Sequence, residues 1–357
     1  MVLKTDDPLW TEVLAGTAHD FYHLPQYVEL EARRQQGEAM ALLVTHVGDD
    51  FALLPLITRR LPATLKGIDD KFRDAVSPYG YPCPLFEGVH SEEASWQGEV
   101  ITQIIAVLAE LFICSAFIRL HPLYPAPKLA TPSHGTMVRH GNTVWLDLER
   151  TEEELRKQMR KTTRNLVGRL YREDFTARME DSHEALEQFE GIYTETMCRL
   201  KVDPAYFFGK QYILDLKKAL GSSLHVCLVR HNGQAVAAGL FSEVCGIVQY
   251  HLSGTCSDYV HRSPTRLMLD YVRDWSKGRG NKRFHLGGGF GVKDDGLYRF
   301  KKGFSADKSE FFSWRIISLP ELYEEASQEW ARQSLSLDSE ADGFFPCYRR
   351  PVVSSCR

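Results

Sequence analysis

The chain has 357 residues, with 43 lysine and arginine residues against 47 aspartate and glutamate residues, and a formal net charge of −4. Hydrophobic residues make up 43% and charged residues 25% of the chain, close to the globular average. This composition excludes disordered, collagen-like and coiled-coil proteins, and the length predicts two domains or one large one.

Targeting and membrane signals are weak along the whole chain. The N-terminus lacks the apolar core of a signal peptide. The most apolar window, Val100–Ile118, contains Gln103, Glu110 and Ser115, which favours a buried helix followed by a strand over a membrane span. The eight cysteines include no CxxC pair and several lie in apolar runs, so we expect small buried side chains in a reducing cytoplasm and no disulfide or zinc framework.

The first half of the chain predicts one α+β unit. A helix is expected over residues 24–30, with Pro25 in its first turn. Two apolar runs, Met40–Thr45 and Phe51–Thr58, flank the turn residues 48–50 and predict a hairpin. The next elements are a turn-rich stretch, a helix and a strand, over residues 77–84, 94–111 and 117–120.

The second half repeats this order. Strands over Leu224–Arg230 and Ala235–Glu243 are joined by Asn232-Gly233, a strong hairpin signal. A third strand, a helix and a fourth strand are expected over residues 247–255, 264–277 and 284–286. The two sets lie about 185 residues apart, which predicts a tandem duplication.

The junction between the halves is expected near 149–154, where a strand over Thr143–Leu148 gives way to Thr151-Glu152-Glu153-Glu154, a capping box that opens a helix. We therefore expect an N-terminal domain over 1–149, a C-terminal domain over 150–333, and a polar, partly loose tail over 334–357.

A basic helix is predicted directly after the junction, over Leu155–Arg172. It carries seven lysine and arginine residues and no acidic residue, and its apolar stripe is Leu155, Met159, Leu166 and Leu170. An unpaired basic face of this kind would follow a phosphate backbone. The alternative is a solvated face that acidic residues elsewhere in the fold neutralise.

A glycine-rich string follows the last strand, from Phe284 to Phe304. Gly287-Gly288-Gly289 lets backbone N–H groups approach a substrate, as an oxyanion site requires. The alternative is a flexible turn followed by a basic helix end. In Gln249–Thr255, a lone strand histidine such as His251 is more often a structural residue than a base. The aromatic residues of Ile192–Leu200 and Tyr206-Phe207-Phe208 are expected in the core, and the alternative is that Arg199 and Tyr206 line a cleft.

Several established motifs are missing. The chain contains no HExxH, no GxSxG, no Walker loop and no Cys/His cluster. Metal dependence and covalent serine catalysis are therefore not expected.

These strings together resemble the Fem-type aminoacyltransferases and the GNAT-like proteins that share their architecture. The resemblance covers residues 20–320 and is carried above all by Leu297-Tyr298-Arg299-Phe300-Lys301-Lys302-Gly303-Phe304. Further matching strings are Tyr193–Arg199 with 206–208, Tyr250–Thr255, His285–Gly289, Arg164-Asn165-Leu166 and Ser77–Leu85.

The resemblance implies an α+β protein of two tandem GNAT-like domains that face a shared cleft. It implies a cytoplasmic bacterial enzyme that moves an aminoacyl group from aminoacyl-tRNA to an amine of a peptide, a cell-wall precursor or a natural product, with no metal and no cofactor besides the tRNA co-substrate. No long heptad run interrupts the second half, so the family's coiled-coil arm has no counterpart.

The identity of the acyl donor is further indicated by the absence of a pyrophosphate-binding loop. Acyl-CoA enzymes of this fold hold the pyrophosphate with a Q/R-x-x-G-x-G/A loop at a helix N-terminus. The corresponding stretch, Cys256–Arg266, has no glycine, and Pro264 removes a backbone donor. This departure favours a tRNA-borne donor over acyl-CoA.

From the resemblance we expect Lys301 and strand N–H groups to stabilise a tetrahedral oxyanion, and Asp295 or His251, with His285 as a further candidate, to relay the amine proton. The oxyanion donors would come from the backbone of Gly287, Gly288 and Gly289. Substrate and tRNA contacts are expected from Arg160, Lys161, Arg164, Arg199, Tyr206, Tyr250, Arg299, Lys302 and Tyr79. Two alternatives stay open: an acyl-CoA-dependent N-acyltransferase, and a non-catalytic tRNA-binding or scaffold module.

Overall fold

The computed structural model describes residues 1–45, 49–202, 207–289, 294–333 and 343–351. The chain forms two compact units: unit 1 comprises Met1–Arg139 and Phe312–Arg357, and unit 2 comprises His140–Phe311. These limits differ from the expected boundary near residue 149 and from a separate C-terminal tail. The reason is strand pairing: Ser313–Ile317 are hydrogen-bonded to Ser115–Arg119, which assigns the end of the chain to unit 1.

Unit 1 is built on a sheet with the strand order β1-β2-β3-β4-β6-β13, in which β5 also pairs with β3. Its strands are β1 (Val2–Leu3), β2 (Glu38–Thr45), β3 (Phe51–Arg60), β4 (Arg73–Val76), β5 (Leu85–Glu87), β6 (Ile113–Arg119) and the end of β13 (Lys308–Ile317). Its helices are α1 (Pro8–Ala15), α2 (Pro25–Arg34), α3 (Ala94–Glu110) and α10 (Pro320–Gln333), with short 3₁₀ turns η1 (Phe21–His23), η2 (Pro132–His134) and η7 (Cys347–Arg349). The predicted first helix, hairpin, long helix and following strand are confirmed.

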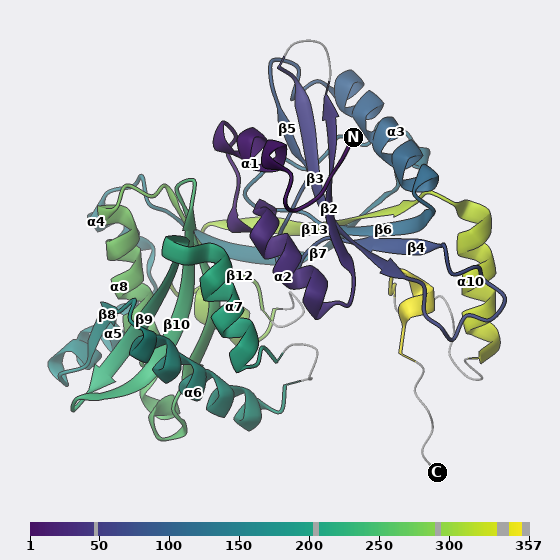
Figure 1. Ribbon diagram of the computed structural model, residues 1–357. Coiled ribbons are helices and arrows are strands. Elements are labelled where there is room, and N and C mark those ends of the chain that lie inside the picture. The colour runs from purple at the N-terminus through teal and green to yellow at the C-terminus, as the bar shows by residue number, and fades with distance from the viewer. Residues whose placement is uncertain (46–48, 203–206, 290–293, 334–342, 352–357) are drawn as a thin grey trace. The chain divides into compact units, whose positions relative to one another are not determined.

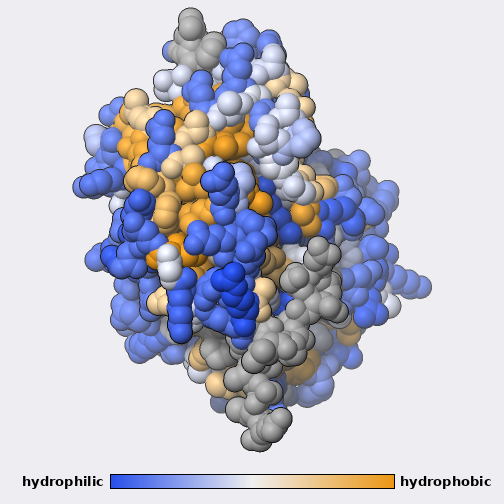
Figure 2. Space-filling model, turned by 90° about the vertical axis from the view of Figure 1, so that its right-hand side faces the viewer, coloured by the Kyte–Doolittle hydropathy of each residue, from blue (hydrophilic) through white to orange (hydrophobic). Residues whose placement is uncertain are grey.

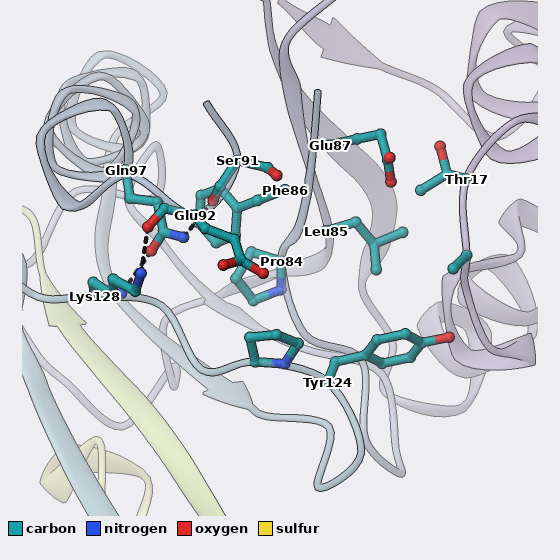
Figure 3. A pocket seen from close by; sticks show the side chains of 12 residues that line it. Thr17, Pro84, Leu85, Phe86, Glu87, Ser91, Glu92, Gln97, Tyr124 and Lys128 are labelled. Carbon is teal, nitrogen blue, oxygen red and sulfur yellow. Dashed lines mark hydrogen bonds between the residues drawn. The ribbon is translucent and has the colours of Figure 1, made fainter. Parts of the chain in front are cut away.

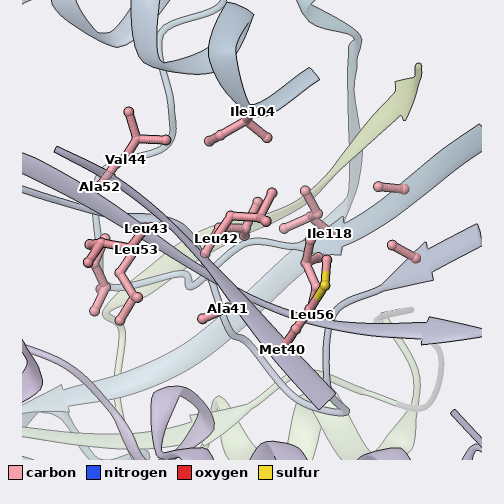
Figure 4. Close-up of a cluster of buried hydrophobic side chains, with 14 of the residues drawn as sticks. Met40, Ala41, Leu42, Leu43, Val44, Ala52, Leu53, Leu56, Ile104 and Ile118 are labelled. Atoms are coloured by element: carbon pink, nitrogen blue, oxygen red, sulfur yellow. The ribbon is translucent and has the colours of Figure 1, made fainter. Parts of the chain in front are cut away.

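The core of unit 1 lies between α3 and the central strands. Figure 4 shows Ile104 of α3 above Leu42 of β2, with Ile118 of β6 beside them, and all three are buried. This packing explains the apolar window over Val100–Ile118, which is one buried helix and one buried strand as predicted. Among the described residues no helix is long and apolar enough to cross a membrane.

The outer surface of the molecule is mostly polar in the view of Figure 2, apart from one area where apolar side chains gather. Exposed apolar residues of unit 1 include Val89 in a loop and Leu111 and Phe112 at the end of α3. Single exposed apolar residues of this kind are normal for a folded protein.

In unit 2 the strands follow the order β7-β12-β11-β10-β9-β8. Its strands are β7 (Thr136–Asp147), β8 (Thr176–Met179), β9 (Leu224–His231), β10 (Gln234–Val244), β11 (Ile247–Thr255) and β12 (Arg283–Gly287). Its helices are α4 (Glu152–Gln158), α5 (Lys161–Arg172), α6 (His183–Leu200), α7 (Lys210–Leu220), α8 (Thr265–Gly278) and α9 (Gly296–Lys301), with 3₁₀ turns η4 (Gly221–Ser223) and η5 (Ser257–Arg262). The predicted hairpin is confirmed, since Asn232 and Gly233 have φ values of 51° and 79°.

Both units repeat one topology, which confirms the predicted duplication. In unit 1 the antiparallel run β2-β3-β4 leads through α3 to β6, which is parallel to β4. In unit 2 the antiparallel run β9-β10-β11 leads through α8 to β12, which is parallel to β11.

Helices cover both faces of the unit 2 sheet. A Cβ added to Gly239 in β10 would meet Met268 of α8, whereas one added to Gly254 in β11 would meet Ile192 of α6. Gly254 pairs with Ala238, the neighbour of Gly239, so the two glycines face opposite sides of the sheet. Figure 1 shows α6 and α7 together on one of these sides.

The basic segment after the junction is two helices, so the expectation of one helix over Leu155–Arg172 is wrong. The chain is extended at Met159 and Arg160, with ψ values of 136° and 140°. The backbone N–H of Arg160 donates a hydrogen bond to the carbonyl oxygen of Gly303 at 2.9 Å. The Arg164 guanidinium donates a hydrogen bond to the carbonyl oxygen of Arg156 at 2.9 Å. These contacts replace intrahelical bonds and stabilise the break. The predicted capping box of Thr151 and Glu154 is present at the start of α4.

The described part of the tail, residues 343–351, packs against unit 1. Tyr348 is 1% exposed, and its hydroxyl lies 2.7 Å from the Ser115 hydroxyl. Among the seven described cysteines none forms a disulfide; Cys83, Cys114 and Cys227 are buried as expected, but Cys198 and Cys245 are exposed.

Candidate functional site

The parallel strands β11 and β12 part at one end of unit 2. Their ladder has three pairs and ends at Gln249 opposite His285. Beyond this point β11 continues along β10 with a bulge, because Tyr250 pairs with Phe241 and Leu252 pairs with Leu240, which leaves His251 as the extra residue. The backbone after His285 and the segment Tyr250–Thr255 therefore flank the space where the ladder stops.

Lys301 occupies this space. It is the last residue of α9, a helix whose N-cap is Asp295: the Asp295 carboxylate accepts the backbone N–H of Tyr298 at 2.8 Å. The Lys301 side chain is buried, and its Nζ donates to the carbonyl oxygen of Gly288 at 2.7 Å. The same atom lies 5.6 Å from the ring centroid of Tyr250. The amine thus bridges the two strands where they are no longer paired.

The environment of Lys301 disfavours its charge. Burial lowers the pKa of the Lys301 amine to about 7, and the negative charge of Asp295 opposes this shift. Near neutral pH the amine exists in both forms. Such a group can place a positive charge against a developing oxyanion and can also exchange a proton.

Aromatic and imidazole groups line the same place. Burial raises the pKa of the Tyr250 hydroxyl to about 12, and this hydroxyl is hydrogen-bonded to Ser253. His251 is half-buried on the bulge, with its ring centroid 6.4 Å from that of Phe208. His285 is fully buried, and its Nδ1 lies 2.7 Å from Oε1 of Gln249, the residue opposite it in the ladder. This burial favours a positioning role for His285, whereas His251 has partial access to solvent.

Two basic segments far apart in the sequence meet beside α9. The bond from Arg160 N to Gly303 O joins the start of α5 to the end of α9. It brings Arg160 and Lys161 close to Lys302, and all three side chains belong to exposed residues. Among the described residues no carboxylate pairs with Arg160 or Lys161, whereas other cations of the basic segment do pair, for example Lys157 with Glu153 at 2.7 Å. The basic face is therefore partly neutralised, and its unpaired part lies next to α9.

Other predicted contact residues have local partners. Arg299 is exposed and donates through Nε to the Asp295 carbonyl at 3.1 Å. Arg164 caps the end of α4, and Arg199 of α6 donates to the Ser257 hydroxyl at 2.9 Å. Tyr79 belongs to unit 1, where its carbonyl oxygen accepts the Tyr27 hydroxyl at 2.8 Å.

The remaining predicted positions are the three glycines at the end of β12 and the aromatic residues after α6. Gly287 closes β12 with a φ of 77°, Gly288 is buried and Gly289 is half-buried. Tyr206 lies outside the described residues. In the neighbouring aromatic set Tyr193 and Phe208 are buried, which supports the structural alternative for both.

Gln249 and Arg266 are site residues that sequence reasoning missed. Gln249 orients His285, and no motif marks it. Arg266 stands at the start of α8, where its guanidinium lies 4.8 Å from the Phe300 ring and donates to Thr163 at 3.3 Å. Burial lowers the pKa of this guanidinium, and among the described residues its buried Nε has no hydrogen-bond partner. The only sequence signal was the position of Arg266 at the end of the glycine-free loop.

The loop before α8 forms the 3₁₀ turn η5. The backbone N–H groups of Arg266 and Leu267 donate to the carbonyls of Ser263 and Pro264, both at 3.0 Å. These two donors of the first turn of α8 are therefore occupied, in agreement with the missing glycines of a pyrophosphate loop.

A separate pocket of about 270 Å³ lies in unit 1 (Figure 3). Its wall includes Glu87, Glu92, Tyr124 and Lys128, and the backbone N–H of Lys128 donates to Gln97 at 2.7 Å. It contains none of the predicted site residues. In the described part of the chain no group of three or more His, Cys, Asp or Glu side chains is placed to hold a metal ion.

Comparison with known proteins identifies the fold. A family model described as an acetyltransferase (GNAT) domain matches residues 150–302. None of the curated proteins matches the sequence. The solved structure of FemX is 12% identical and has a TM-score of 0.67, with 91% of this chain and 99% of that chain covered.

Two further structures are similar over most of their length. L-PGS from Bacillus licheniformis is 14% identical with a TM-score of 0.55, covering 87% of this chain and 92% of that chain. The C-terminal domain of a putative lysylphosphatidylglycerol synthetase from Agrobacterium fabrum is 13% identical with a TM-score of 0.55, covering 85% and 89%. Together with the repeated topology, these likenesses confirm the predicted two-domain GNAT-like fold.

Proposed function

We propose that this chain, which has a Fem-type GNAT-like fold, is an acyltransferase that forms an amide bond by moving an aminoacyl group from an aminoacyl-tRNA to an amine. The acceptor class is a peptide, a cell-wall precursor or a small natural product. The observation that carries the proposal is the buried Lys301 amine, held by Gly288 O where β11 and β12 part.

The geometry supports a direct transfer. The acceptor nitrogen attacks the ester carbonyl of the donor, and the carbonyl oxygen becomes an oxyanion. Protonated Lys301 stabilises this oxyanion, together with backbone N–H groups of the Gly287–Gly289 segment. The carbon–nitrogen bond forms, the carbon–oxygen bond to the ribose breaks, and no covalent enzyme intermediate is required.

The proton of the attacking amine passes to the leaving ribose oxygen. Asp295 and His251 are the candidates for this relay, since both are half-buried residues near Lys301 or its β11 wall. His285 acts through Gln249 as a positioning residue, because it is fully buried.

The charges beside α9 favour a donor with several phosphates. Arg160, Lys161, Arg299 and Lys302 are exposed and surround the bond that joins α5 to α9. A phosphate backbone would be attracted to this group of cations. The occupied backbone donors in the first turn of α8 weigh against an ordinary acyl-CoA loop. One structural neighbour is named as a putative lysylphosphatidylglycerol synthetase, and the product in that name is aminoacylated.

The direct test is incubation of the full chain with charged bulk tRNA and a panel of candidate amines, followed by mass spectrometry. We expect a new amide whose mass equals the amine plus one aminoacyl residue, and no product after ribonuclease treatment of the tRNA. Absence of every such product across the panel, with intact charged tRNA recovered, would contradict the proposal.

An acyl-CoA-dependent N-acyltransferase is the second candidate, favoured by the GNAT family match over residues 150–302. It predicts that CoA raises the melting temperature of the protein. A non-catalytic module predicts instead that replacing Lys301 and Asp295 changes no activity or phenotype.

A further inference from the structure

A cavity of about 410 Å³ opens on unit 1, and none of the residues of the proposed transfer site lines it. It is formed where β3 ends, where β4 begins and where the α2–β2 turn approaches β3. Four arginines line it: Arg59, Arg60, Arg73 and Arg349. The first three come from the central strands and the fourth from the described part of the tail, so the fold gathers them from three segments.

The turn wall of this cavity has little freedom. A Cβ added to Gly37 would lie 2.5 Å from the carbonyl oxygen of Thr58 and 2.7 Å from Cγ2 of Ile57. The backbone of the turn therefore lies directly against β3, and the cavity beside it is a fixed feature of the sheet.

Two of the arginines share one buried carboxylate. Asp74 is fully buried; its Oδ1 accepts from Arg59 Nε at 3.0 Å, and its Oδ2 accepts from Arg349 Nε. Burial lowers the pKa of the Arg59 guanidinium, Asp74 opposes this, and the positive charge of Arg349 lowers it further. A second anion would relieve the repulsion between these two guanidinium groups.

The other two arginines have no acidic partner. Arg73 donates to the backbone carbonyls of Asp70 and Phe72, and Arg60 is exposed. Within the described ranges neither forms an ion pair. The lining thus contains four arginines and one acidic residue, Glu38, while the buried Asp74 pairs with Arg59 and Arg349 only.

We propose that this cavity is a binding site for the diphosphate group of a small molecule. Guanidinium groups present paired N–H donors that match phosphate oxygens, and arginine is preferred where such planar recognition is needed. A cavity of this size holds a small ligand and is too confined for a packed protein segment. Arg59 and Arg349 are held in place by Asp74, and Arg60 and Arg73 supply charge that no carboxylate of the described ranges pairs with. The inference is independent of the proposed transfer reaction, because it concerns unit 1 alone.

The test uses the full chain and isothermal titration with inorganic pyrophosphate, a nucleoside diphosphate and sulfate, at 0.15 M ionic strength to screen non-specific attraction. We expect both diphosphates to bind at least about tenfold more tightly than sulfate, as paired phosphates engage more guanidinium donors. If only the nucleoside diphosphate binds, the base contributes and the diphosphate assignment still holds. Equal binding of sulfate and pyrophosphate, or no binding of either diphosphate, would overturn the proposal.

Two variants locate the site. Arg60→Gln and Arg73→Gln remove cations that have no acidic partner, so both should fold, and each should weaken pyrophosphate binding about tenfold. Arg33→Gln is the matched control: it removes a nearby, 70% exposed cation that pairs with Glu29 and does not line the cavity. Binding that is unchanged in the first two variants, or equally weakened in the control, would contradict the assignment.

Discussion

Lys301 Nζ, at the end of α9, lies 2.7 Å from the carbonyl oxygen of Gly288, the residue that follows β12. The bond holds a buried amine where β11 and β12 stop pairing. Several measurable consequences follow from this placement and from the charges beside it.

The first prediction concerns stability against pH. The pKa of Lys301 is about 7 in the folded chain and near 10.5 when unfolded. Below pH 7 the Lys301 amine is charged in both the folded and the unfolded chain, so the folded chain bears the full free-energy cost of burying that charge. Between pH 7 and 10 the unfolded chain binds more protons, and stability rises with pH. We expect the free energy of unfolding of the wild type, relative to Lys301→Met, to rise by up to about 1.4 kcal/mol per pH unit in this window. Urea unfolding at pH 6 to 9 measures this difference in the free energy of unfolding. If the free energy of unfolding changes with pH in the same way in both proteins, the buried lysine is not desolvated.

The second prediction separates two roles of Asp295. Asparagine retains an oxygen that accepts the Tyr298 N–H, so Asp295→Asn should keep the cap of α9 and the melting temperature. It removes the carboxylate, and we expect turnover to fall about 100-fold if Asp295 relays the proton. Full activity of a stable Asp295→Asn variant would leave His251 as the relay and reduce Asp295 to a cap.

The third prediction concerns the contact between α9 and α5. A Cβ on Gly303 would lie 2.6 Å from Thr163 Oγ1 and 2.9 Å from the Phe300 carbonyl oxygen. Gly303→Ala should therefore reduce the free energy of unfolding by about 1–3 kcal/mol. Gly296→Ala is the control, since nothing lies within 4 Å of its added Cβ. Chemical denaturation of both variants tests this, and equal stability of the two would show that the contact is looser than described.

The fourth prediction concerns the donor. Arg160→Gln and Lys161→Gln remove unpaired cations at the start of α5 and should raise KM for aminoacyl-tRNA about three- to tenfold, with little change in kcat. The dependence of KM on salt should weaken in parallel. Lys218→Gln, an exposed cation of α7, serves as the comparison. An unchanged KM in all three variants would place the donor phosphates elsewhere.

The sequence predicted what local chemistry determines. The Asn232-Gly233 hairpin and the Thr151 capping box follow from a few adjacent residues, and both are present. The duplication could be predicted because the same order of local signals occurs twice. The apolar window over Val100–Ile118 was assigned correctly because polar residues interrupt it.

The remaining features depend on contacts between distant segments. The helix break at Met159–Arg160 was missed because the helical spacing continues through it, and the competing partner, Gly303, lies far along the chain. Strand β13 was missed because its partner in unit 1, β6, lies even farther away along the chain. At the site, the family resemblance pointed to Lys301, but its burial and the role of Gln249 follow only from the paired strands.

The role of the buried Lys301 amine is best measured by single-turnover transfer from labelled aminoacyl-tRNA to an accepted amine. The comparison is between wild type, Lys301→Met and Lys308→Met, an exposed lysine of β13 outside the site. We expect Lys301→Met to slow amide formation about 100-fold or more while its melting temperature does not fall below that of the wild type, and Lys308→Met to retain full activity. A folded Lys301→Met protein that forms the amide at the wild-type rate would contradict the central claim.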